Sequence, residues 1–257
     1  MTGPNEKLAA SLAVLERLQK GGRRIFQTAE FSRYHRERLH QHGFLQPVMK
    51  GWWMTSSPET RPGDTTPWYS SFWKFCALYC TDRFGSEWHL SPDQSLLIQA
   101  EATTVPRQLV VYTPKGKNNA IELPFNTGIY DLKHESMPQE EDLTDRDGLR
   151  LFALGPALIK APPSFYERNP VEAQVALASV RDASDLLPRL LDGGHSVVAG
   201  RLAGAFRRIG RGDVADELTT VMERAGFGVR ESDPFVSDHA PITFRGFTPP
   251  IVSRLTA

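Results

Sequence analysis

The hydrophobic pattern of the first 57 residues changes from helical to strand spacing. Leucines three and four positions apart predict a helix over residues 5–20. A second, amphipathic helix is expected from about Ser32 to Gln41, and the glycine that follows it suits a helix end. Two short apolar runs, at 44–49 and 52–54, predict a β-hairpin. This order predicts a winged helix-turn-helix domain over residues 1–57.

The second predicted helix has one apolar and one polar face. At 100° per residue, Phe31 and Leu39 share the inner side, and arginine, glutamate and histidine fall on the outer side. In a DNA major groove, arginine can donate two hydrogen bonds to guanine and glutamate can accept one from cytosine. A solvated helix with mixed charges is the alternative. The candidate DNA contacts are Arg23, Arg24, Ser32, Arg33, Arg36, Glu37, His40 and Lys50.

Charge is distributed unevenly along the chain. The whole sequence has 30 basic and 30 acidic residues, so its net charge gives no argument for a nucleic-acid partner. The first 57 residues, however, carry nine basic and only four acidic side chains. A basic amino-terminal segment on a neutral chain is typical of a DNA-binding domain joined to a neutral one. We expect Arg23 and Arg24 either to contact phosphate or to complement the dipole of the first helix.

After a polar linker at residues 56–67, the pattern predicts an α/β domain over residues 68–230. Residues 68–80 are aromatic nearly all round, which indicates a buried helix rather than a cofactor or base-stacking surface. Cys76 and Cys80 within it suit core packing better than a disulfide or a zinc site. Strands are expected at residues 108–112, 120–123 and 149–153.

The remaining segments are expected to be loops and helices. The basic loop at 113–119 lacks the spacing of a phosphate-binding loop. The acidic segment at 135–147 is expected to be an exposed loop, not a catalytic carboxylate pair. From Pro170 onward the apolar spacing is helical. Residues 231–257 contain several prolines and no periodicity, which is typical of a tail or linker.

The helix expected over residues 195–209 is basic and has small residues on one side. Alanine and glycine at 199, 200, 203 and 204 would allow another helix to approach closely. A second DNA contact, a dimer face and a solvated face are all open interpretations of its arginines. These arginines are Arg201, Arg207, Arg208 and Arg211.

Several segments, taken in order, carry a family resemblance. They are Lys50-Gly51-Trp52-Trp53, the block 68–75, Leu90-Ser91-Pro92-Asp93-Gln94-Ser95, Val105-Pro106-Arg107-Gln108 and the run 199–204. Together they resemble the amino-terminal region of bacterial Fic-domain proteins, which is similar to the AbiEi-type antitoxin and transcriptional regulator family. The resemblance implies a winged helix followed by an α/β domain, and a toxin–antitoxin-like locus. The family's Gly-Trp-Tyr at the wing is Gly-Trp-Trp here.

No enzymatic activity is expected from this sequence. The catalytic loop of Fic enzymes, a histidine-phenylalanine run ending in Gly-Asn-Gly-Arg, does not occur in it. The seven histidines form no H-E-x-x-H motif and no clear triad, so no metal or cofactor is expected. The sequence shows no signal-peptide pattern and no apolar run that could span a bilayer, so we expect a cytoplasmic protein without membrane contact.

Two functional hypotheses follow for a chain of the α+β class. The leading one is a DNA-binding transcriptional regulator or antitoxin-like protein that binds a double-stranded operator, as a homodimer. The alternative is a protein-interaction module of a Fic-type nucleotidyltransferase, with a cognate toxin or a Fic domain as its partner. A basic stripe across Arg23, Arg33, Arg36 and Lys50 would favour DNA, and a neutral surface there would favour the interaction module.

Overall fold

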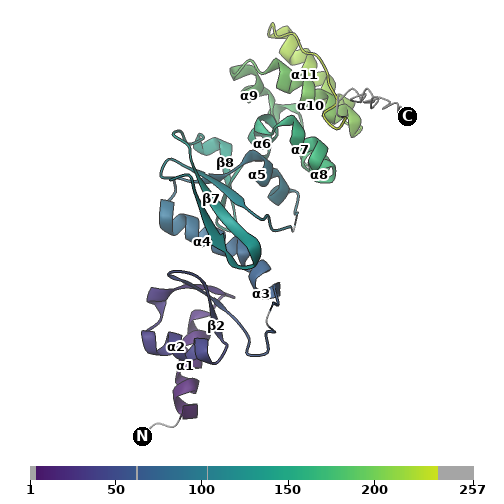
Figure 1. Ribbon diagram of the computed structural model, residues 1–257. Coiled ribbons are helices and arrows are strands. Elements are labelled where there is room, and N and C mark those ends of the chain that lie inside the picture. Colours follow the sequence, from purple (N-terminus) through teal and green to yellow (C-terminus); the bar gives the residue numbers. More distant parts are fainter. Residues whose placement is uncertain (1–3, 62, 103, 237–257) are drawn as a thin grey trace, which may run out of the picture.

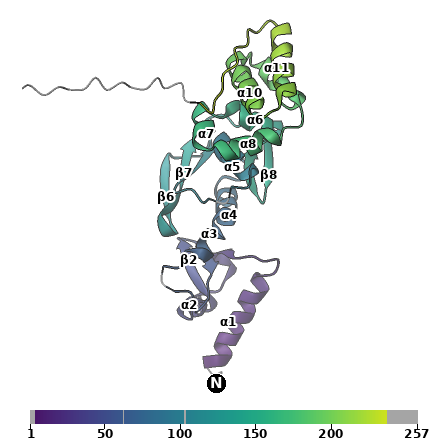
Figure 2. The same ribbon diagram turned by 90° about the vertical axis from the view of Figure 1, so that its right-hand side faces the viewer.

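The computed structural model describes residues 4–61, 63–102 and 104–236 and shows a mixed α+β fold, as the sequence predicts (Figure 1). Three groups of elements follow one another along the length of the molecule (Figure 2). They are an amino-terminal group around a small sheet, a central four-stranded sheet, and a carboxyl-terminal group of helices. In this described part, no helix is both long enough and apolar enough to cross a membrane.

The amino-terminal group combines helices with a three-stranded antiparallel sheet of order β1-β3-β2. The predicted hairpin is present, with Lys50 and Gly51 in its turn. Between β1 and α2 lies only a single 3-10 turn, because Glu30 folds back to accept a hydrogen bond from the backbone N–H of Gln27 at 2.8 Å. The elements are α1 (Pro4–Leu18), β1 (Ile25–Gln27), η1 (Thr28–Glu30), α2 (Arg33–Gln41), β2 (Leu45–Met49) and β3 (Trp52–Thr55).

This small sheet is buried on both faces. Alternation along its strands sends Phe26 and Leu45 towards the core formed with α1 and α2. Trp52 and Met54 point the other way, into a second core that continues beyond the predicted linker at 56–67. Trp52 is buried and Trp53 only partly so, as the alternation of the two residues predicts. The amino-terminal group therefore shares a hydrophobic core with the central part of the chain.

The aromatic segment expected to be one helix forms two, α3 (Thr66–Tyr69) and α4 (Phe72–Phe84). The break falls at Ser70 and Ser71, where the Ser70 hydroxyl donates to the carbonyl of Pro67 at 3.1 Å and competes with the helical pattern. The aromatic rings nonetheless fill the core, as predicted. Cys76 and Cys80 are buried free thiols, and burial raises the pKa of both.

The central sheet has the strand order β4-β5-β7-β6, with β5 and β7 parallel and the other pairs antiparallel. The sequence pattern predicts β5 and β6 but not β7, the longest strand in the described part of the chain. Asp131 on β7 is fully buried. Its carboxylate accepts hydrogen bonds from the backbone N–H groups of Lys117 and Asn119 and forms an ion pair with Arg83. The elements here are β4 (His89–Leu90), α5 (Pro92–Gln99), β5 (Leu109–Thr113), β6 (Asn119–Leu123), η2 (Pro124–Asn126) and β7 (Thr127–Lys133).

The acidic segment 135–147 is not simply an exposed loop, and that prediction is wrong in part. It contains η3 (Glu140–Asp142) and the strand β8 (Leu143–Arg146), which pairs with β9 (Leu149–Phe152). Its carboxylates have long-range partners, since Asp142 lies 2.5 Å from the guanidinium of Arg189 and Glu140 lies 3.0 Å from that of Arg150. Such pairings hold the acidic residues against neighbouring elements.

The carboxyl-terminal group packs around one apolar core that includes Phe165, Phe206 and Leu218. Prolines at the first turn begin α7, α8 and α9, which suits their missing N–H. The helices are α6 (Leu154–Lys160), α7 (Pro163–Arg168), α8 (Pro170–Ala178), α9 (Leu187–Asp192), α10 (Ser196–Arg208) and α11 (Gly212–Arg224), with the turn η4 (Ala183–Asp185) before α9. Of the predicted tail at 231–257, residues 237–257 lie outside the described part.

The small residues of α10 accept an extended segment of chain, not the helix that the sequence suggested. A Cβ on Gly200 would lie 2.0 Å from the carbonyl oxygen of Arg230, and one on Gly204 would lie 2.1 Å from that of Ser232. The backbone N–H of Ser232 donates to the carbonyl of Gly200 at 3.2 Å. Glycine is therefore required on this side of α10 because backbone lies directly against it.

We expect the Gly200→Ala substitution to lower the free energy of unfolding by about 1–3 kcal/mol, since the added methyl group overlaps a backbone oxygen. Alanine would otherwise favour the helix. Urea denaturation followed by circular dichroism measures the change. Gly228→Ala is the matched control, because its Cβ would meet open space and should leave stability unchanged or slightly raised. Equal stability of Gly200→Ala and the native chain would contradict the close contact.

Candidate nucleic-acid interface

Helix α2 is fixed to the amino-terminal group at its start, along its inner side and at its end. The Ser32 hydroxyl caps it by accepting from the backbone N–H of His35 at 3.3 Å. The His35 ring lies 2.9 Å from the Ser11 hydroxyl of α1, and Leu39 is completely buried. Gly43 ends the helix with a positive φ of 78°. These contacts leave the opposite side of α2 open to solvent.

Arg33 and Glu37 lie on that open side and pair with each other. The Arg33 Nε donates to Glu37 at 2.6 Å, and the side chains are 83% and 52% exposed. Glu37 raises the pKa of Arg33 through this bond. Solvent screens this pair, so it contributes little to stability. A phosphate can therefore replace Glu37 as the partner of Arg33, and the N–H edge of a base can replace Arg33 as the partner of Glu37, at little cost in free energy.

The Arg36 side chain extends from α2 towards the hairpin. Its guanidinium donates to the carbonyl of Thr28 at 3.4 Å and lies 5.7 Å from the ring centre of Trp53. Thr28 in turn binds the hairpin twice: its N–H donates to the carbonyl of Gly51, and its hydroxyl accepts from the Trp53 indole at 2.9 Å. Thr28 therefore brings the first turn of α2 and the turn of the hairpin side by side.

His40 is attached to the hairpin through one ring nitrogen only. Its Nδ1 lies 3.0 Å from the carbonyl oxygen of Leu45, and its ring meets Trp53 edge to face at 5.4 Å. A carbonyl can only accept, so Nδ1 carries the hydrogen of this bond. Nε2 remains available to a partner outside the chain, because His40 is exposed.

The other candidate cations are placed differently from one another. Arg23 donates to both carboxylate oxygens of Glu30, at 3.0 and 2.7 Å, and stays 43% exposed. Arg24 donates to the Ser70 hydroxyl at 3.0 Å and so ties the amino-terminal group to the α3–α4 break. Lys50 is exposed in the hairpin turn, without a partner among the residues that the structure describes.

The same helix carries a further pair that is absent from the candidate DNA contacts, Tyr34 and Arg38. The Arg38 guanidinium lies 4.7 Å from the centre of the Tyr34 ring, and Tyr34 is 46% exposed. The Arg38 Nε is buried and has no hydrogen-bond partner in the described part of the chain, so this atom is not open to an external group. Their four-residue spacing on one helix was the available signal. Stacked arginine and exposed tyrosine are chemically suited to a phosphate or a base.

The four arginines suggested as a second DNA contact have partners within the chain. Arg201 donates to the carbonyl of Ala161 and Arg211 to that of Val180. Arg207 and Arg208 hold the extended segment against α10 through ion pairs with the residues Glu231 and Asp233, at 2.7 and 2.9 Å. They lie at the opposite end of the molecule from α2 (Figure 1). We therefore place the candidate interface on α2 and the hairpin.

Comparison of this sequence with protein-family models and with curated protein sequences gives no family for the chain. No protein-family model matches it, and no curated protein sequence matches it. Within residues 4–61, 63–102 and 104–236, no group of three or more histidine, cysteine or acidic side chains could hold a metal ion.

We expect Leu39→Ala to lower the free energy of unfolding by about 2–5 kcal/mol, because the side chain is completely buried and its removal opens a cavity beneath α2. Chemical denaturation measures the loss. Gln41→Ala, at an exposed position of the same helix, is the control and should change stability by no more than about 0.5 kcal/mol. Equal effects of the two substitutions would mean that α2 does not pack through Leu39.

Proposed function

We propose that this protein binds double-stranded DNA through a winged helix and acts as a transcriptional regulator or antitoxin-like protein. In this proposal α2 enters the major groove, and the β2–β3 hairpin is the wing that contacts phosphates. The observation that carries the proposal is the junction at Thr28, where Arg36 of α2 and the hairpin turn meet. One DNA duplex can touch both elements together only because they adjoin.

The polar groups of this surface match the chemistry of a duplex. Arg33, Arg36 and Arg38 supply guanidinium donors for guanine and phosphate, and Glu37 supplies an acceptor for cytosine. Lys50 in the turn supplies an exposed ammonium group for a backbone phosphate. The proposed partner is an operator at the protein's own promoter, bound by a homodimer.

A protein-interaction module is the second candidate function, with a toxin or a Fic-type catalytic domain as the partner. The observation in its favour is that Glu30 and Glu37 neutralise Arg23 and Arg33, two of the four cations of the expected basic stripe. In that case the same surface would recognise a protein of mixed charge. Measurements of DNA binding separate the two candidates.

We expect Arg36→Ala to weaken binding to the operator by roughly 1–3 kcal/mol and to relax preference at one base position, if this arginine reads a guanine. Fluorescence anisotropy on specific and random duplexes measures both effects. Arg224→Ala, which removes an exposed arginine from the last turn of α11, is the matched control and should bind as the native chain does. A uniform loss on all sequences would assign Arg36 to a phosphate instead.

We expect Lys50→Ala to weaken binding to every duplex about equally and to lower the salt slope of log K by about 1, since one phosphate contact is lost. Titration at several salt concentrations gives the slope. Lys74→Ala removes an exposed lysine from α4 and serves as the control. If the native protein binds no duplex in a salt-dependent manner, its own promoter included, DNA recognition is refuted and the interaction module takes its place.

A further inference from the structure

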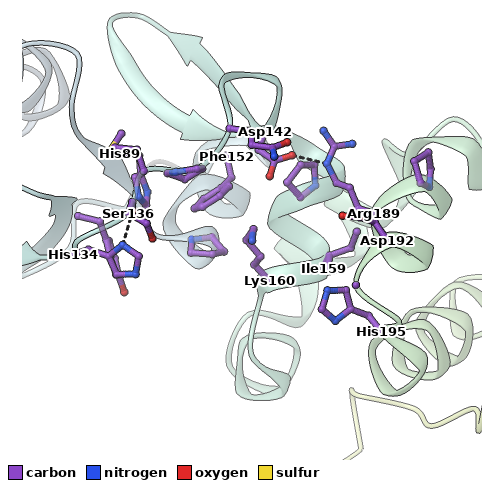
Figure 3. Close-up of a pocket in the computed structure, with 18 residues that line it drawn as sticks. His89, His134, Ser136, Asp142, Phe152, Ile159, Lys160, Arg189, Asp192 and His195 are labelled. Atoms are coloured by element: carbon purple, nitrogen blue, oxygen red, sulfur yellow. Dashed lines mark hydrogen bonds and ion pairs between the residues drawn. The ribbon is translucent and has the colours of Figure 1, made fainter.

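A cavity of about 1000 Å³ lies between the central sheet and the carboxyl-terminal helices. One wall comes from β4, β5 and β9, and the opposite wall from α9 and from His195, which precedes α10. In Figure 3 the His89 and His134 side chains lie on one side, Asp192 and His195 lie on the other, and Lys160 extends between them. The DNA proposal uses none of these residues.

One wall of the cavity is a set of packed rings. The imidazole of His89 stacks on the phenol of Tyr112, with centres 5.3 Å apart and planes only 12° from parallel. Phe152 meets the same imidazole edge to face at 5.0 Å. Packed rings of this kind offer a planar ligand both stacking and edge contacts.

His89 also brings a polar atom to this wall. It is 4% exposed, and its Nδ1 lies 2.9 Å from the carbonyl oxygen of Leu90, so Nδ1 is the donor. Burial lowers the pKa of His89, which favours the neutral ring. Its Nε2 has no hydrogen-bond partner in the described part of the chain. Buried polar atoms without partners are uncommon in folded proteins. Because Nδ1 carries the hydrogen, Nε2 is an acceptor, which is satisfied by an N–H or O–H donor and not by an anionic group.

Lys160 supplies the one formal positive charge that no carboxylate in the described lining neutralises. It stands at the end of α6, with its ammonium group 5.8 Å from the centre of the Phe152 ring. The other lining cation, Arg189, is already paired with Asp142 at 2.5 Å. Asp192 is exposed at the rim of the cavity, and no ion pair joins it to Lys160. An ammonium group above an aromatic wall therefore faces the cavity without a counter-ion.

We propose that this cavity binds a small organic anion that carries a planar ring. The carboxylate or phosphate of the ligand pairs with the Lys160 ammonium, and its ring packs on Tyr112, the half-buried ring of this wall, beside the buried rings of His89 and Phe152. His134, whose Nδ1 lies 2.7 Å from the carbonyl oxygen of Ser136, stands beside this wall. The site is separate from the proposed DNA surface and does not depend on it.

The test uses the full chain in the absence of DNA, with isothermal titration calorimetry as the measurement. Benzoate and phenyl phosphate are the probes, and the tighter of the two identifies the anionic group that the site prefers. Acetate and inorganic phosphate lack the ring, and benzamide lacks the charge. We expect saturable binding of at least one ring-bearing anion at millimolar concentration, and weaker binding of all three controls.

Two matched variants assign the binding to the cavity. Lys160→Met removes the ammonium group from an exposed side chain and should weaken the anion roughly tenfold or more, the effect of losing one charge-assisted hydrogen bond. Lys74→Met, an exposed lysine of α4, should bind like the native chain. Circular dichroism confirms that both variants are folded. Absence of binding by both ring-bearing anions, equal binding of a control compound, or unchanged binding by Lys160→Met would each overturn the proposal.

Discussion

The burial of one small sheet on both faces is the constraint on which the rest of the structure depends. Trp52 places its ring 5.7 Å from Phe75 and 6.2 Å from Tyr79, while Phe26 on the other face packs beneath α2. A slip of β3 by one residue would send Trp52 and Met54 into the core beneath α2 and Trp53 into the opposite core, so neither core would receive the side chains that fill it. The position of α2 relative to α4 is fixed by the same packing, and with it the direction in which the candidate interface faces.

The arginines of α10 and those of α2 are of two kinds, which differ in the groups that they contact. Those of α10 bind carboxylates and carbonyls of their own chain and hold the extended segment after α11 in place. Those of α2 either pair within one exposed turn, as Arg33 does, or rest on an aromatic ring, as Arg36 and Arg38 do. An arginine on a ring keeps most of its donors free, because the ring uses the face of the guanidinium and not its edge. The second kind is the one suited to an external phosphate or base.

The candidate interface and the cavity lie against different hydrophobic cores, which are linked by strands with residues in two cores. Trp53 of β3 packs on the core beneath α2, and Trp52 of the same strand packs on α4 in the central core. Leu149 and Leu151 of β9 belong to that central core, whereas Phe152 of the same strand belongs to the carboxyl-terminal core and lines the cavity. The proposed DNA surface and the proposed anion site thus stand against separate cores.

The sequence by itself determined the elements whose signals are local. Helical leucine spacing, the amphipathic pattern of residues 32–41 and the Lys50-Gly51 turn predict α1, α2 and the hairpin, because hydrophobic period and turn chemistry act within a few residues. The sequence pattern does not predict the strand β7, because its polar residue Asp131 is buried and interrupts the apolar pattern. Its partners, Arg83 and the loop before β6, are distant in sequence.

Only the tertiary structure decided which charges have partners and what lies against the small residues of α10. Nothing near Gly200 in the sequence reveals that the carbonyl of Arg230 occupies the space of its missing side chain. In the same way, composition shows that the amino-terminal segment is basic but not that Glu30 and Glu37 neutralise two of its arginines. Ion pairs and close backbone contacts depend on distances set by the whole fold, whereas a sequence pattern records only the neighbours of each residue along the chain.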